Sequence, residues 1–165
     1  MAIYFFDSSA IVKYYHDEPG SIWTRQIVDA RGISNGDRSN VVYVSAASIA
    51  EVPAAFAILE RNKRTSLRLR DSLYRAFIDA LENELRILQV TVDLFYNAAR
   101  LTQQHPLKGY DAVQLATALD FQTRLKEQDL SLIFVSGDAN LVEAAQAEGL
   151  TTENPFDHSD LDSNS

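Results

Sequence analysis

Residues 2–9 read AIYFFDSS, a short apolar and aromatic run that ends at a carboxylate and two hydroxyls. The apolar part is typical of a buried strand, and Asp7-Ser8-Ser9 is typical of the N-cap of a helix that follows at once. Similar runs, rich in β-branched and aromatic residues, predict further short strands at residues 41–44, 86–90, 132–135 and 150–152.

The intervals between these strands have the apolar spacing of helices. Besides a short helix after Ser9, helices are predicted at residues 21–30, 46–61, 66–84, 92–104, 109–127 and 138–147. Residues 31–40 are polar with two glycines and are expected to form a loop. Short strands that alternate with helices predict an α/β fold, with a central parallel sheet and helices on both faces.

The chain has 165 residues and no cysteine, which fits one domain without disulfides or thiolate sites. The folded domain is expected over residues 1–153, and the polar, acidic residues 154–165 are expected to be a disordered tail. Only five apolar residues precede Asp7, and no basic segment stands before them. We therefore expect no signal peptide, no membrane contact and a cytoplasmic location.

Three aspartates stand where strands end or helices begin. Asp7 follows the first strand, Asp111 lies at a helix start and Asp138 follows the fourth strand. In parallel sheets, ligands bind beyond the carboxyl ends of the strands, so these side chains are candidates for one site. Each aspartate taken alone is more simply explained as an N-cap, and Asp111-Ala112-Val113-Gln114 also fits a capping box.

Glu51 favours the functional interpretation. No charged residue occurs in the ten positions before Glu51 or the eight after it, so no salt bridge is available on its own helix. An unpaired, desolvated carboxylate is costly and usually holds a proton or a cation. The structural alternative is a capping box with Ser48 as the N-cap, which the helical pattern of Ala46 and Ala47 weakens but does not remove.

Asp138 also has apolar neighbours at helical spacing and no basic partner on its helix. Four carboxylates that meet at one sheet edge repel one another unless cations lie between them. A site made only of oxygen ligands suits Mg²⁺ or Mn²⁺ better than zinc. Two such ions can activate a water and stabilise the leaving oxygen of a phosphodiester, so the chemistry needs no cysteine, histidine or lysine nucleophile.

The net charge of −8 argues at first sight against a nucleic-acid partner. Four of the acids, however, lie after the last expected strand: Glu153, Asp157, Asp160 and Asp162. If the four candidate ligands also face bound cations, the rest of the domain is close to neutral. A charge summed over the whole chain is therefore a poor guide to its partners.

Four segments in this order resemble the PIN-domain family and, within it, the VapC-type toxins of bacterial toxin–antitoxin pairs. They are YFFDSSA at residues 4–10, SIAEV at 48–52, GYDAVQLATA at 109–118 and FVSGDANL at 134–141. The resemblance extends from about residue 2 to residue 155. It implies a three-layer PIN-like fold, a Mg²⁺- or Mn²⁺-dependent endoribonuclease that hydrolyses RNA with a metal-activated water, a homodimer and a cognate antitoxin.

The resemblance also assigns roles to individual residues. It makes Asp7, Glu51, Asp111 and Asp138 the catalytic, metal-binding carboxylates. It makes Ser9 a hydroxyl that orients Asp7, and Ser136 a contact to phosphate or to a metal ligand. Two positions depart from the family pattern: Gln114 stands where many relatives have histidine, and Pro53 interrupts the start of the Glu51 helix.

Six of the fifteen basic residues fall between Arg61 and Arg75. Arg64, Arg68 and Arg70 are the candidates for contact with the RNA backbone, since phosphate neutralisation supplies most non-specific affinity. An ordinary solvated helix pair explains the same cluster equally well.

Three other functions are compatible with an aspartate after the first strand. A haloacid-dehalogenase-type phosphatase needs a second aspartate two residues after the first, but Ser9 stands there. A phosphoacceptor receiver domain needs a lysine soon after a late strand, and residues 135–138, VSGD, lack it. The remaining alternative is a catalytically silent PIN-like module that binds RNA or protein. The presence of all four acids counts against that alternative.

Overall fold

The computed structural model describes residues 2–30 and 40–164. Its centre is a five-stranded, wholly parallel sheet of order β3-β2-β1-β4-β5. The strands are β1 (Ile3–Phe6), β2 (Val41–Ser45), β3 (Arg86–Leu88), β4 (Leu132–Val135) and β5 (Thr151–Glu153). Strand β1 lies in the middle, with Ile3 opposite both Val41 and Leu132.

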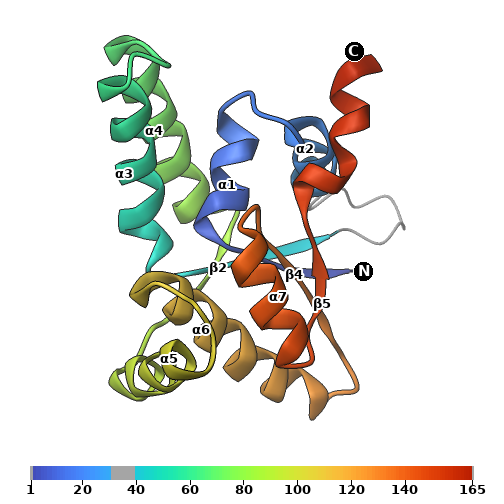
Figure 1. Cartoon of the computed structure of the whole chain (residues 1–165). Helices are drawn as coiled ribbons and strands as arrows, with labels where there is room; N and C mark the ends of the chain where they lie inside the picture. The colour runs from blue at the N-terminus through green and yellow to red at the C-terminus, as the bar shows by residue number, and fades with distance from the viewer. Residues whose placement is uncertain (1, 31–39, 165) are drawn as a thin grey trace.

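Helices cover both faces of this sheet, as the sequence predicts (Figure 1). They are α1 (Ser8–Tyr15), α2 (Ser21–Asp29), α3 (Ser48–Arg61), α4 (Leu67–Asn83), α5 (Val92–Gln104), α6 (Gly109–Lys126) and α7 (Ala139–Ala147). Every residue of β1 is buried, and its side chains alternate between two cores. Phe5 packs with α5, α6 and α7, whereas Phe6 packs with α1, α3 and α4. The expected three-layer α/β fold is confirmed.

Helix α3 continues from Ser48 to Arg61 through Pro53, so the expected interruption at this proline is wrong. Proline removes one backbone hydrogen bond of the helix. The fully buried side chains of Val52 and Phe56, on either side of Pro53, hold the helix against the core.

The disorder expected for residues 154–165 is also wrong for most of that segment. Pro155–Asn164 form a 3₁₀-type segment, η1, that lies beside α2 (Figure 1). The ring of His158 stacks on Trp23 with centroids 4.4 Å apart and planes 5° apart. The carboxylate of Asp162 accepts hydrogen bonds from the backbone N–H groups of Gly20 and Ile22, where α2 lacks a side-chain cap of its own.

Two further expectations have different outcomes. Residues 31–39, most of the expected loop, lie outside the described residues. Asn40 directly precedes β2, and its backbone N–H donates to the carbonyl of Ala30 at 3.3 Å. Among the helices that the structure describes, none is both long enough and apolar enough to cross a membrane.

Candidate active site

A cavity of about 230 Å³ lies beyond the carboxyl ends of β1 and β4. All four sequence-predicted carboxylates line it, although they come from four different parts of the chain. Its lining residues are Asp7, Ser8, Ser9, Val12, Glu51, Ala55, Asp111, Gln114 and Asp138. A larger cavity of about 700 Å³ lies between the α1–α2 turn, α2 and η1, but it contains none of the predicted site residues.

Asp7 is the most buried of the four acids, with 4% of its surface exposed. Its carboxylate accepts hydrogen bonds from Ser9 Oγ at 2.8 and 3.0 Å, from Ser136 Oγ at 2.7 Å and from the Ala10 N–H at 2.8 Å. Burial raises the pKa of Asp7 to about 6, even though these hydrogen bonds lower it, and the charge of Glu51 adds to the rise. Ser9 and Ser136 thus both donate to Asp7.

Asp138 and Asp111 begin two helices in different ways. Asp138 is the N-cap of α7, because its Oδ1 accepts the Leu141 N–H at 3.1 Å. Asp111 lies within the first turn of α6, which begins at Gly109 with Lys108 at the N-cap position, so the capping box that starts at Asp111 is wrong. Burial raises the pKa of Asp111, and the charges of Asp138 and Glu51 add to this effect.

Glu51, on α3, is held by a hydroxyl from α1 and an amide from α6. Its Oε2 accepts hydrogen bonds from Ser8 Oγ at 2.8 Å and from Gln114 Nε2 at 2.6 Å. The capping box with Ser48 is wrong, because α3 already begins at Ser48 and the N-cap position, Ala47, has no side-chain bond. The Ser48 hydroxyl lies instead 3.0 Å from Ser8 Oγ and 3.1 Å from Gln114 Nε2.

Sequence reasoning missed the part that Ser8, Ser48 and Gln114 take in this site. Ser8 follows Asp7 directly, and Gln114 lies one helical turn after Asp111, which are weak signals of a shared location. The packing of α1 and α6 against α3 brings Ser8 and Gln114 to Glu51, and Ser48 lies three positions before Glu51 on α3 itself.

The three arginines suggested for RNA contact do not line the cavity. Arg64 lies 3.4 Å from Glu18, and Arg70 lies 2.6 Å from Asp71 and 3.8 Å from Glu60. Arg68 makes no ion pair with any side chain that the structure describes. All three belong to the α3–α4 hairpin or its turn.

The donor set fits a hard divalent cation in its chemistry. It offers only oxygen ligands, and the negative charge of Glu51 helps to raise the pKa of both Asp7 and Asp111. Within residues 2–30 and 40–164, however, no three acidic or histidine side chains stand in a geometry ready to hold a metal ion. The carboxylates of Asp7 and Asp138 turn toward hydroxyl groups and helix N–H groups instead.

The sequence model of the family described as "PIN domain" matches residues 4–150. The chain belongs to the PIN-domain family. PIN domains are generally nucleases, which sets the phosphatase and receiver alternatives aside. Comparison with curated protein sequences finds no match.

Several solved structures resemble this one along nearly the whole chain. FitAcB from Neisseria gonorrhoeae is 19% identical with a TM-score of 0.54, and covers 93% of this chain and 98% of its own. VapBC2 from Rickettsia felis, bound to a DNA fragment from its promoter, is 15% identical with a TM-score of 0.56, covering 92% and 98%. VapC20 from Mycobacterium tuberculosis, a toxin that cleaves the sarcin–ricin loop, is 18% identical with a TM-score of 0.58, covering 91% and 97%. At these identities the likeness shows the fold alone.

Proposed function

We propose that this PIN domain is a Mg²⁺- or Mn²⁺-dependent endoribonuclease that hydrolyses RNA phosphodiester bonds with an activated water. The observation that carries the proposal is the meeting of four carboxylates around one cavity of about 230 Å³. No basic side chain among the described residues lines that cavity, and the nearby charge of Lys108 does not offset the rise in the pKa of Asp111. The site therefore suits a cation from solution.

Asp7, Glu51, Asp111 and Asp138 would hold the cation. When bound, such an ion lowers the pKa of a water nucleophile and neutralises charge that develops on the phosphodiester. The chain's own part is to orient the carboxylates. Ser9 and Ser136 fix both oxygens of Asp7, and the backbone N–H of Asp138 donates to Ser136 Oγ at 3.0 Å, which couples β1 to β4 across the site.

The biological role proposed for this activity is that of the toxin in a toxin–antitoxin pair. The similarity in fold to VapBC2, FitAcB and VapC20 supports it, and so do the four motifs. The implied partners are an RNA substrate, a cognate antitoxin and a second copy of the chain in a homodimer. An RNA substrate would place the activity in the cytoplasm.

The test is cleavage of end-labelled RNA by purified protein with different cations. Mg²⁺ and Mn²⁺ should support cleavage, and Ca²⁺ should bind with little turnover because its looser coordination positions a water poorly. Attack by water leaves a 5′-phosphate and a 3′-hydroxyl. A 2′,3′-cyclic phosphate would show attack by the RNA's own 2′-hydroxyl and disprove the mechanism. RNA binding without turnover would favour the catalytically silent module.

A further inference from the structure

Gln114 of α6 is a buried polar residue that reaches across the site. Only 2% of its surface is exposed, and its Nε2 lies near oxygens from two other helices. The distances are 2.6 Å to Glu51 Oε2, 2.9 Å to Ser8 Oγ and 3.1 Å to Ser48 Oγ. The amide therefore joins α6 to α1 and α3 at the point where the Glu51 carboxylate enters the cavity.

The orientation of this amide is set by Glu51. Rotating the amide by half a turn would place Oε1 against a carboxylate oxygen, where two acceptors would repel each other. In the observed orientation, Oε1 is buried and has no hydrogen-bond partner among the described residues. An unpaired buried acceptor destabilises a fold, so the contact with Glu51 is kept at the expense of stability.

A second glutamine of the same helix shows the ordinary structural arrangement. Gln122 is also buried, and its Oε1 accepts the backbone N–H of Leu132 at 2.9 Å, which satisfies a polar group at the start of β4. Gln122 thus stabilises the fold, whereas Gln114 leaves its own acceptor unpaired and serves a carboxylate of the site.

The two hydrogen bonds to Glu51 reach the same carboxylate oxygen. Both the Gln114 amide and the Ser8 hydroxyl donate to Oε2, and no described residue donates to Oε1 of Glu51. One carboxylate oxygen is therefore fixed and the other is left for a cation.

We propose that Gln114 is a positioning residue that ties one oxygen of Glu51 and so presents the other to a divalent metal ion. This inference rests on the function proposed above. Hydrogen-bonding partners of metal ligands commonly change metal affinity by about 10- to 100-fold when they are removed.

The experiment compares Gln114→Met with the wild-type protein, because methionine keeps the length of the side chain and removes the amide. Calorimetric titration with Mn²⁺ should show roughly tenfold weaker binding. Cleavage should lose kcat while KM for RNA stays unchanged, since Gln114 acts on Glu51 and does not bind substrate. Melting in EDTA should occur at the same or a higher temperature because the unpaired Oε1 is gone. Gln114→His, which restores an N–H donor, should recover most of the Mn²⁺ affinity.

Gln122→Met is the matched control. It should melt at a lower temperature, because the Leu132 N–H loses its acceptor, and it should keep wild-type Mn²⁺ affinity and cleavage per folded molecule. Wild-type Mn²⁺ affinity in Gln114→Met, or no recovery in Gln114→His, would overturn the inference alone. A wild-type protein that neither binds Mn²⁺ nor cleaves RNA would overturn the proposed function and this inference with it.

Discussion

Asp7 caps helix α1 through the same carboxylate that lines the acidic cavity. Asp138 does the same for α7. The sequence alone offers capping and metal binding as alternatives at these positions, but the structure shows that a cap can also face the site. The reason is geometric: a helix that begins at the carboxyl end of a parallel strand places its cap at the edge where ligands bind.

The four acids could be found from sequence because each has a local signal. Asp7 and Asp138 follow apolar strands, Asp111 lies at a helix start, and Glu51 lies on an apolar helix without countercharges. Ser8, Ser48 and Gln114 have no local signal of comparable strength. Hydroxyl and amide side chains are common, and their role depends on how three helices pack, which no local pattern encodes.

The raised pKa of Asp7 makes a prediction about stability without metal. Between the ordinary value of 3.8 and the folded value of about 6, the folded state holds a proton that the unfolded state has lost. Stability of the wild-type protein should therefore fall as pH rises from about 4 to about 6, by on the order of 3 kcal/mol at most. Asp7→Asn should remove this pH dependence, melt in EDTA at the same or a higher temperature near pH 7, and abolish cleavage.

Thermal melts in EDTA at pH 4 to 7 check this prediction. Ser9→Ala is a useful comparison, because it removes a hydrogen bond to Asp7 and keeps the carboxyl group. A loss of stability in Asp7→Asn that is equal at every pH would show that Asp7 acts mainly as the cap of α1.

At the level of elements, the sequence predicts most strands and helices closely, because each is defined by its own periodicity. Strand β4 has the predicted ends, 132–135, and β3 ends two residues early. Residues 155–164 were missed for the opposite reason. Their acidic composition is locally typical of disorder. Their partners are Gly20, just before α2, and Trp23, within α2, which lie more than 130 positions earlier in the chain.

The contact between η1 and α2 can be followed with Trp23, the single tryptophan of the chain. Asp162→Ala removes the acceptor that serves the Gly20 and Ile22 N–H groups, so it should loosen η1 and lower the melting temperature. Trp23 emission should shift to longer wavelength as His158 leaves its ring. Asp157→Ala is the control, since Asp157 is exposed and its side chain carries the same charge. Equal effects of the two variants would show that charge, and not the cap, holds η1.

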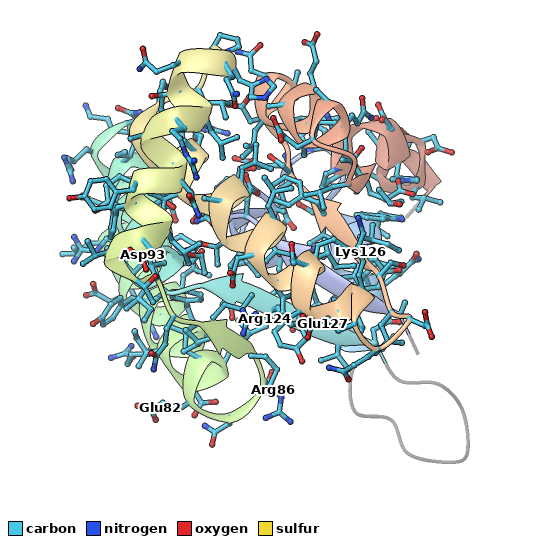
Figure 2. The ribbon with its side chains drawn as sticks, turned by 90° about the horizontal axis from the view of Figure 1, so that it is seen from below. Glu82, Arg86, Asp93, Arg124, Lys126 and Glu127 are labelled. Atoms are coloured by element: carbon cyan, nitrogen blue, oxygen red, sulfur yellow. The ribbon has the colours of Figure 1, made fainter. Side chains whose placement is uncertain are left out.

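At the level of the whole molecule, two groups of three basic residues lie in different regions. One is the α3–α4 hairpin with Arg64, Arg68 and Arg70. The other is the face seen in Figure 2, where Arg86, Arg124 and Lys126 lie near the ends of β3 and α6 that are remote from Asp111. Strands run in one direction in this sheet, so the second region lies at the amino edge, opposite the acidic cavity. Glu82, Asp93 and Glu127 lie on the same face as the second group (Figure 2), and Arg124 pairs with Asp120 at 3.0 Å. The two groups of three basic residues thus differ in their position relative to the proposed site.

Charge removal in these two regions gives the last prediction. Replacing Arg64, Arg68 and Arg70 by glutamine should weaken binding to all RNAs alike. On single-stranded RNA, the slope of log affinity against log salt should fall by roughly 0.7 for each phosphate that the protein no longer neutralises. We expect the slope to change by less than the loss of three phosphate contacts would give, because Arg64 and Arg70 already pair with Glu18 and Asp71. Cleavage at saturating RNA should be nearly unchanged, since these residues would bind ground state and transition state equally.

The matched control replaces Arg86, Arg124 and Lys126 by glutamine, which changes the net charge by the same amount at the amino edge of the sheet, away from the acidic cavity. If the hairpin contacts RNA, only the first triple variant changes the salt slope, because screening at about 10 Å in 0.1 M salt makes such effects local. Equal losses of affinity in both variants would mean that only net charge matters. An unchanged slope in the hairpin variant would mean that its arginines do not contact RNA and instead pair with acids of their own domain. If that variant also lost binding to a co-purifying small protein, the hairpin would be assigned to a protein partner.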